Sequence, residues 1–432
     1  MLDMNWIREN EELVRNTAEW KRVAFPLEEL LEQDDTKRRL LQETEQLRAQ
    51  RNALTKEVEQ ALRGGDSAAG QAAKEQVRAL NGRLSSLEAK LAEAQRRCGE
   101  LLLLAPNPVS ADTPIGSGDS DNVLLRLEGQ PPEFGFAPRD HVELGELHGI
   151  IDLPRGVKAG GPRSYVLKGA GLDLHLAVQR LAVDVLTRRG FTVMDVPVIV
   201  RPEALERTGF FPGGRDQTYE LTGENRWLAG TSEVSLVSLY SDEIVELETP
   251  MRLGGMSACF RSEVGSAGRD VRGLYRVHQF SKIEQVVFCR SDQGASERML
   301  QEILANAEYI LQLLELPYRV MAVCTGDMSL KTHKQYDIET WMPGREAYGE
   351  THSASNLLDF QARRSNIRYR DEQGRLQYCH TLNNTAVATP RILIPLLENH
   401  QQEDGSIYIP QALRQYMNGK EKLDLPPAQY EL

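Results

Sequence analysis

Charged side chains gather in one stretch of the chain that apolar sequence flanks on both sides. Residues 260–284 read FRSEVGSAGRDVRGLYRVHQFSKIE, between MSAC and QVVFC. Arg261 and Glu263 stand two residues apart, and so do Lys282 and Glu284. Because side chains two apart on a strand share a face, we expect these pairs to form a charged face of a sheet. Buried charges persist when they are paired or bind a ligand, so the stretch predicts a binding site.

The same spacing recurs upstream, and a glycine-rich loop lies inside the charged stretch. LAGTSEVSL places Thr231 and Glu233 two residues apart, which predicts a third strand with a polar face. GSAGRDVRG at 265–273 offers backbone N–H groups together with Arg269 and Arg272. Such a loop suits a polyanion such as a triphosphate. A surface sheet with ordinary ion pairs across its strands remains an alternative on the pattern alone.

A further arginine precedes an apolar segment near the C-terminus. The segment LNNTAVATPRILIPLLENH begins at Leu382, where we expect the preceding hairpin to end. Thr389 and Pro390 are typical of an N-cap and a first helical position. Arg391 would then lie in the first turn of a buried helix, where the helix dipole and the guanidinium both favour an anion.

Composition excludes several classes of protein. The 432 residues carry a formal net charge of −12, which argues against bulk binding to nucleic acid or anionic membranes. The longest aliphatic run, LLLLA, is too short to span a bilayer, and the N-terminus lacks the features of a secretory signal. Five cysteines without close spacing indicate reduced thiols and no zinc site. We therefore expect a cytoplasmic protein. It contains neither a P-loop nor a dinucleotide-binding glycine motif after a strand.

The first quarter of the chain differs from the rest. Residues 27–104 contain no aromatic side chain, and their apolar positions from Val77 to Leu101 alternate steps of three and four. This heptad pattern, with a glycine-bearing reversal at 63–71, predicts two antiparallel helices of about 35 residues each. Between Lys37 and Arg97, 13 Lys or Arg face 8 Asp or Glu, a net of +5 that leaves −17 elsewhere. A basic arm on an acidic body favours a nucleic-acid contact, although a helical hairpin packed on its own domain remains open.

The remainder mixes helices and strands. Residues 105–122 are rich in Pro, Gly, Ser and Asp, which indicates a linker between residues 1–104 and a domain at 123–420. A helix at about 173–189 should precede a strand at 191–200, and residues 367–382 should form a hairpin. The fold class is α+β, with a largely antiparallel sheet and an α-helical arm, and the tail at 421–432 has no interpretation.

Three segments together resemble a known family. The helix and strand ending at Pro197, FRSE…RVHQFSKIE, and TPRILIPLLENH resemble motifs 1, 2 and 3 of class II aminoacyl-tRNA synthetases. TSE at 231–233 and the helical arm make the chain similar to the seryl-tRNA synthetases of bacterial type. The resemblance implies activation of L-serine by ATP to seryl-adenylate, followed by transfer to tRNA(Ser). It implies tRNA binding by the arm, a homodimer formed through motif 1, and Mg²⁺ that arrives with ATP.

The resemblance also implies roles for individual residues. Those expected to bind serine are Thr231, Ser232, Glu233, Arg261, Glu284, Asn383 and Thr385. Those expected to bind ATP are Arg261, Ser262, Glu263, Val277, Phe280, Glu350, Thr351, His352, Ser353 and Arg391. Of these, Arg261, Glu350 and Arg391 are expected to act in catalysis, and Glu350 and Ser353 to hold the metal.

Three features depart from the pattern of many relatives. Ser232 replaces an alanine, THSASN replaces ISSCSN, and Thr385 replaces a serine in the amino-acid pocket. An amino-acid:carrier-protein ligase and a non-enzymatic tRNA-binding paralogue are the alternatives. The first would lack the long arm and the second would have lost site residues, whereas both are present here. Whether tRNA(Sec) is also charged stays open.

Overall fold

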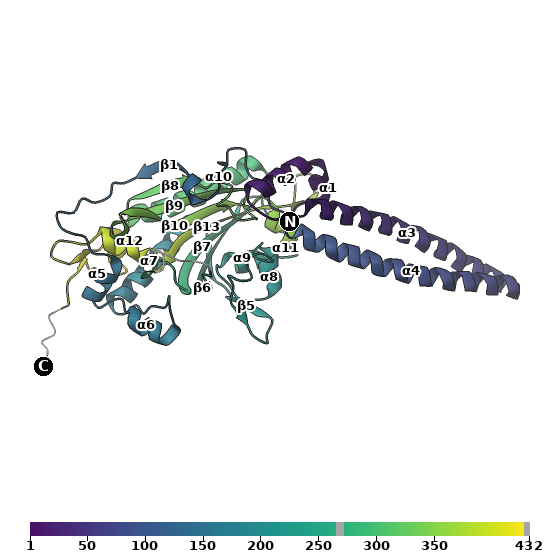
Figure 1. The fold of residues 1–432 in the computed structure, drawn as a ribbon, viewed down its shortest axis with the longest axis horizontal. Helices are drawn as coiled ribbons and strands as arrows, with labels where there is room; N and C mark the ends of the chain where they lie inside the picture. Colours follow the sequence, from purple (N-terminus) through teal and green to yellow (C-terminus); the bar gives the residue numbers. More distant parts are fainter. Residues whose placement is uncertain (265–271, 427–432) are drawn as a thin grey trace. The chain divides into compact units, whose positions relative to one another are not determined.

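The computed structural model describes residues 1–264 and 272–426, and the chain divides into two compact units (Figure 1). The smaller unit comprises Leu2–Glu19 and Val23–Pro106. The larger comprises Met1, Trp20–Arg22 and Asn107–Leu432. Arg269 of the expected phosphate-binding loop lies outside the described residues. In the described ranges, none of the helices combines the length and the apolar character that crossing a bilayer requires.

The smaller unit contains the expected helical hairpin. Its helices are α1 Met4–Glu9, α2 Glu11–Trp20, α3 Leu27–Arg63 and α4 Ser67–Leu102. The last two pack side by side along their length. The reversal between them is shorter than expected, because Asp66 caps α4 by accepting the Ala69 N–H at 3.0 Å.

Alternate apolar positions fill the seam of this hairpin. Leu40 and Leu47 of α3 are buried, as are Leu84 and Leu91 of α4. Thr44, a polar residue in the weaker heptads, is also buried and donates to the Leu40 carbonyl at 2.7 Å. Its hydroxyl is satisfied within the helix, so it interrupts neither the seam nor the pairing.

The larger unit is built on an eight-stranded sheet in the order β1-β8-β9-β10-β13-β7-β6-β2. All neighbours are antiparallel except β2 and β6, as the largely antiparallel prediction requires. The strands are β1 Val123–Glu128, β2 Thr192–Asp195, β6 Met251–Phe260, β7 Gln279–Cys289, β8 Tyr318–Ala322, β9 Lys334–Met342, β10 Ala347–Asn356 and β13 His380–Thr389. A smaller sheet contains β3 Ile199–Val200, β5 Arg226–Leu228 and β4 Glu220–Leu221 in that order. β11 Arg368–Arg370 pairs with β12 Leu376–Tyr378, and β14 Ile407–Tyr408 pairs with β15 Lys422–Leu423.

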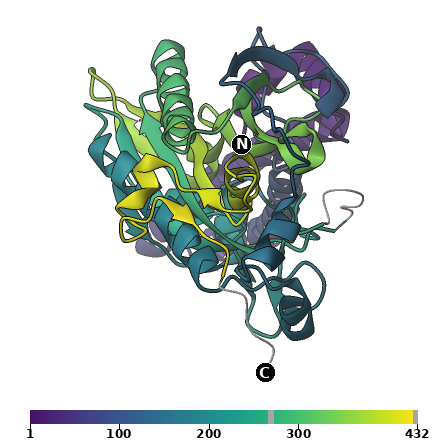
Figure 2. The same ribbon diagram turned by 90° about the vertical axis from the view of Figure 1, so that its left-hand side faces the viewer.

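Helices cover both faces of the large sheet. They are α5 His141–Leu147, α6 Leu153–Gly160, α7 Ala170–Arg188, α8 Pro202–Arg207, α9 Glu233–Ser238, α10 Gln293–Leu313, α11 Phe360–Ser365, α12 Leu393–Asn399 and α13 Gln411–Arg414. α7 and α10, the latter being the long green helix in the upper part of Figure 2, pack against each other and against β7 and β13. α9 and α11 also contact each other and these strands.

Strand β7 shows how one sequence serves both faces. Ile283, Val287 and Cys289 belong to the apolar core that contains α7 and α10. Val286 and Phe288 point the other way and pack with the buried residues of α9. The alternation that the sequence predicted for FSKIEQVVF is therefore confirmed, and its charged members lie on the α9 face.

Two of the expected strands are not strands. β6 ends at Phe260, and Glu263 has a φ of 51°, so the chain leaves the sheet within FRSE. Thr231 precedes α9 instead of sharing a strand with Glu233, and its hydroxyl accepts the Glu233 N–H at 3.2 Å in a local turn. Residues 191–200 likewise form two short strands, β2 and β3, in different sheets.

Two boundaries expected near the C-terminus were also wrong: the end of the hairpin at Leu382, and the start of the helix at Thr389 and Pro390. The hairpin β11–β12 is present, but Leu382 lies within β13, which runs on to Thr389. The Thr389 hydroxyl lies 3.0 Å from Nδ1 of His175 and caps no helix. α12 begins at Leu393 and is buried throughout, so Arg391 stands before the helix and not in its first turn.

Candidate active site

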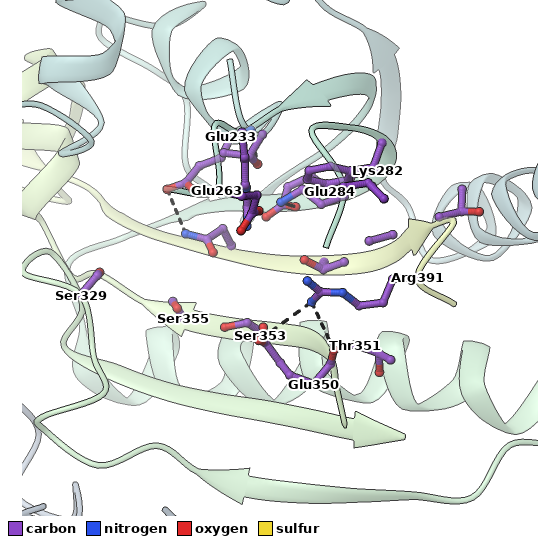
Figure 3. Close-up of a pocket in the computed structure, with 18 of the residues that line it drawn as sticks. Glu233, Glu263, Lys282, Glu284, Ser329, Glu350, Thr351, Ser353, Ser355 and Arg391 are labelled. Atoms are coloured by element: carbon purple, nitrogen blue, oxygen red, sulfur yellow. Dashed lines mark hydrogen bonds and ion pairs between the residues drawn. The ribbon is translucent and has the colours of Figure 1, made fainter. Parts of the chain in front are cut away.

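Side chains from α9, β7, β10, β13 and the connecting loops line a cavity of about 220 Å³ on the α9 face of the sheet. Figure 3 shows Glu233, Glu284 and Arg391 among those that converge on it. The cavity lining also contains these residues expected to bind a substrate: Thr231, Arg261, Glu263, Val277, Phe280, Glu350, Thr351, Ser353, Asn383 and Thr385. Tertiary structure thus gathers positions that are up to 160 residues apart (Thr231 to Arg391).

One part of the cavity is organised around Glu233. This buried carboxylate accepts hydrogen bonds at one oxygen from Lys331 at 2.7 Å, Gln361 at 2.7 Å and Asn383 at 3.0 Å. Burial lowers the pKa of Lys331, and the Glu233 carboxylate opposes that effect. The second carboxylate oxygen remains available to a donor in the cavity. Three donors on one oxygen fix the direction in which the carboxylate points.

Strand β7 adds a second pair of opposite charges. Lys282 and Glu284, two residues apart as the sequence predicted, form an ion pair of 2.5 Å. Burial raises the pKa of Glu284, and the neighbouring Lys282 ammonium limits the rise. Thr385 stands directly opposite Glu284 in the β13–β7 ladder, so a small molecule in the cavity meets both side chains.

Two arginines and two aromatic rings also line the cavity. Arg391 donates to the carbonyls of Tyr275 at 3.0 Å and Glu350 at 3.2 Å, and its guanidinium lies 4.6 Å from the centre of the Tyr275 ring. The Arg261 guanidinium lies 5.3 Å from the centre of the Phe280 ring. Arginines held against aromatic faces are suited to planar rings and phosphates.

Acidic groups concentrate beside Arg391 on β9 and β10. The Glu350 carboxylate lies 3.9 Å from the Arg391 guanidinium, and Ser353 stands opposite Asp337 in the ladder. Burial, together with the charge of Glu350, holds the pKa of Asp337 well above its usual range. A divalent cation would relieve this crowding of negative charge, and oxygen donors such as Glu350 and Ser353 are those that Mg²⁺ prefers. The described residues contain no cluster of three His, Cys, Asp or Glu side chains that could hold a metal by itself.

Comparison with known proteins decides the family. Residues 218–400 match the model of the class II tRNA synthetase core domain (G, H, P, S and T), and residues 1–109 match the seryl-tRNA synthetase N-terminal domain. A serine–tRNA ligase of Deinococcus radiodurans is 47% identical over 427 residues, which cover 99% of this chain and 100% of the relative. The chain belongs to the seryl-tRNA synthetases. A serine–tRNA ligase of Rubrobacter xylanophilus is 44% identical over 96% of this chain and 98% of its own.

Solved structures of seryl-tRNA synthetases share the whole fold. The enzyme from Pyrococcus horikoshii complexed with ATP is similar with a TM-score of 0.91 and 35% identity, covering 99% of this chain and 100% of its own. A cytoplasmic serine–tRNA ligase from Naegleria fowleri in complex with AMP gives 0.87 and 26%, covering 99% of both chains. The resemblance and the fold class inferred from the motifs are therefore confirmed.

Within this seryl-tRNA synthetase, three of the expected ligand residues do not line the cavity. The Ser232 hydroxyl donates to the Gly255 carbonyl at 3.2 Å, and the Ser262 hydroxyl donates to the Asp216 carbonyl at 2.6 Å. His352 is buried beside Thr351, with Nδ1 at 2.8 Å from the Thr351 hydroxyl, and burial lowers its pKa to about 4. The side chains of these three residues are engaged within the protein, and none is among those that face the cavity.

Sequence reasoning missed several side chains of the site. Lys331 and Gln361 contact Glu233 across 98 and 128 residues of sequence, and no local pattern distinguishes them. Asp337 was missed although alternation along β9 places it on the face of Ser353. A search for polar residues at alternate positions of each strand could have found Asp337, but not Lys331.

Proposed function

We propose that this cavity binds ATP and L-serine side by side and joins them as seryl-adenylate, which then acylates the 3′-terminal adenosine of tRNA(Ser). One observation carries the proposal. A single cavity presents a carboxylate with fixed hydrogen bonds, Glu233, together with two arginines, Arg261 and Arg391. The Glu233 carboxylate suits the ammonium of an amino acid, and the two arginines suit a carboxylate and a polyphosphate.

The amino acid would bind between α9 and strand β7. Thr231 and Glu233 would receive the serine ammonium, and Asn383 would keep Glu233 in place. Glu284 and Thr385 would meet the serine hydroxyl, because both face the cavity from neighbouring strands. Alanine would leave these polar groups without their partner, which is a strong basis for rejecting it.

ATP would bind between the two arginines. The adenine ring would lie against Phe280 beside Val277, with Glu263 near its amino group. Arg391, held by two carbonyls, would contact the terminal phosphate, and Arg261 the α-phosphate and the serine carboxylate. These roles account for two arginines that lie over aromatic rings in one cavity.

Mg²⁺ would be held by Glu350 and Ser353 together with the phosphates of ATP. When bound, it would neutralise phosphate charge and so favour departure of pyrophosphate. The fit rests on geometry, because Glu350 and Ser353 line the same cavity as Arg391 and Ser353 stands opposite Asp337 in the ladder.

Catalysis would rest on positioning and on charge. An oxygen of the serine carboxylate forms a bond to the α-phosphorus while the bond from that phosphorus to the bridging oxygen breaks, and pyrophosphate leaves with the electron pair. Arg261 holds the attacking carboxylate and the α-phosphate in line, and Arg391 stabilises the negative charge on the departing group. Glu350 contributes by holding the cation and through its contact with Arg391.

The remaining assignments concern partners and place. We assign residues 1–104 to tRNA binding, 105–122 to a linker and 123–420 to catalysis, in a cytoplasmic homodimer. The dimer is supported by exposed apolar side chains on motif 1 and beside it: Leu172 and Leu176 of α7, and Met256 of β6. Sedimentation should give a dimer, which Leu176→Glu should weaken. A fully active monomer would contradict this assignment.

Two assays test the function. Serine-dependent exchange of pyrophosphate into ATP, without tRNA, should be positive, and its absence would leave only a binding or structural role. Charging of tRNA(Ser) by the same preparation should follow. Transfer of serine to a carrier protein, with no charging of tRNA, would favour the carrier-protein ligase instead.

A further inference from the structure

Lys21 is a buried lysine far from the cavity residues in sequence. It follows α2, and Trp20–Arg22 belong to the same compact unit as residues 107–432. Lys21 is 4% exposed, and its Nζ donates to the carbonyls of Ser329 at 3.3 Å, Leu330 at 3.2 Å and Thr332. An ammonium has three donors, and three carbonyl oxygens meet them.

The segment that Lys21 contacts forms part of the cavity wall. Ser329, Lys331 and Thr332 all line the cavity. The Lys331 ammonium reaches Glu233 at 2.7 Å and lies 3.9 Å from the centre of the Phe210 ring. The backbone position of these few residues therefore sets where Lys331 meets the carboxylate expected to receive serine.

Asn107 holds the same segment from a second point of the chain. Its side-chain amide donates to the Lys331 carbonyl at 2.9 Å, and its backbone N–H donates to the Leu330 carbonyl at 2.9 Å. Lys21 and Asn107 together thus bind all four carbonyls from Ser329 to Thr332. A short segment without regular structure gains a fixed backbone from these contacts, which buried carbonyls require.

We propose that Lys21 is a positioning residue for amino-acid binding, which fixes residues 329–332 so that Lys331 and Glu233 keep their geometry in the cavity. The proposal rests on the serine site assigned above. Lys21 touches neither substrate and acts through Lys331. The N-terminal part of the chain therefore serves the activation of serine as well as the binding of tRNA.

The partners of Lys21 are carbonyl dipoles and not a carboxylate. Burial lowers the pKa of Lys21 to about 7. The ammonium, with three donors, is the form that can meet all three carbonyls.

Lys21→Met tests the proposal, with pyrophosphate exchange measured in the full-length protein at varied serine and varied ATP. Methionine keeps the apolar stem and removes every donor. We expect the KM for serine to rise about 10-fold, with the KM for ATP changed less than twofold. Lys21→Gln, which keeps an amide donor, should recover most of the affinity for serine that Lys21→Met loses. Lys158→Met, at an exposed position of α6 outside the cavity lining, is the matched control and should match the parent.

Three outcomes would overturn the proposal. The first is an unchanged KM for serine in Lys21→Met. The second is an equal rise in the KM for serine and ATP, because a general loss of structure would produce it. The third is an unchanged KM for serine in Glu233→Gln. This result would show that the assigned serine site is wrong, and the role of Lys21 would fall with it. If Glu233→Gln raises that KM and Lys21→Met does not, only the role of Lys21 is refuted.

Discussion

Replacing Arg261 with alanine should separate catalysis from stability more cleanly than any other substitution in the cavity. The side chain is exposed, and its contacts within the protein are weak: a 3.4 Å hydrogen bond to the Gly230 carbonyl and the ring of Phe280 at 5.3 Å. An exposed cation–π contact contributes about 0.5–1 kcal/mol, so the free energy of unfolding should fall by about 1 kcal/mol or less.

The loss of activity should be much larger. A donor aimed at charge that develops in a transition state contributes about 3 kcal/mol, which corresponds to a rate reduced by at least about 100-fold. Arg261→Lys should recover only part of the rate, because an ammonium lacks the planar pair of donors that a carboxylate and a phosphate share.

Pyrophosphate exchange at saturating serine and ATP gives the rate, and urea denaturation gives the stability. Arg298→Ala, at an exposed position of α10 outside the cavity lining, is the matched control and should change neither. An exchange rate within a few fold of the parent for Arg261→Ala would refute the placement of the α-phosphate. A fall in stability of several kcal/mol would refute the view that its contacts are weak.

Three other perturbations test separate parts of the molecule. Deleting residues 35–97 should spare pyrophosphate exchange and abolish tRNA charging if the arm's net positive charge binds the nucleic acid as proposed, and equal loss of both activities would contradict this. Thr385→Ser should increase charging with threonine when it competes with serine, because the parent methyl occupies space that the substrate methyl needs; unchanged use of threonine would exclude Thr385 from the pocket. His352→Gln should make the stability of the fold less sensitive to acid. The pKa of His352 is about 4 in the folded protein and about 6.5 in the unfolded chain. Its contribution to the free energy of unfolding is therefore full above pH 6.5, and it falls by up to about 3 kcal/mol as the pH drops from 6.5 through 4. Urea denaturation at pH 7 and pH 4.5 measures this, and an equal fall in parent and variant would refute it.

Period-two alternation predicted the part of the site that depends on regular structure. Phe280, Lys282 and Glu284 were placed on one face of a strand, and all three line the cavity from β7. A strand imposes this geometry regardless of what surrounds it, so the sequence is sufficient. The helical arm was predictable for the same reason, because its seam repeats over many turns.

Alternation failed where a local hydrogen bond or a turn ends the regular structure. Thr231 and Glu233 do face the cavity, but from the start of a helix, and Arg261 and Glu263 do so from a turn beyond β6. The four side chains line one cavity, but the elements that carry them differ from those predicted. Lys331 was beyond reach of any local pattern, because the segment that carries it is shaped by partners more than 200 residues away in sequence.

Two buried carboxylates of the site form ion pairs within the protein, which helps them to share one cavity. Glu233 meets Lys331, and Glu284 meets Lys282, so each of these two carboxylates has a cation at 2.7 Å or less. Removing one partner would leave an unpaired buried charge at a cost of about 3–5 kcal/mol. In the proposed site, serine would therefore meet carboxylates that are already oriented. Arg261, by contrast, has weak contacts within the protein, so its charge is available to the carboxylate and phosphate whose reaction it would accelerate.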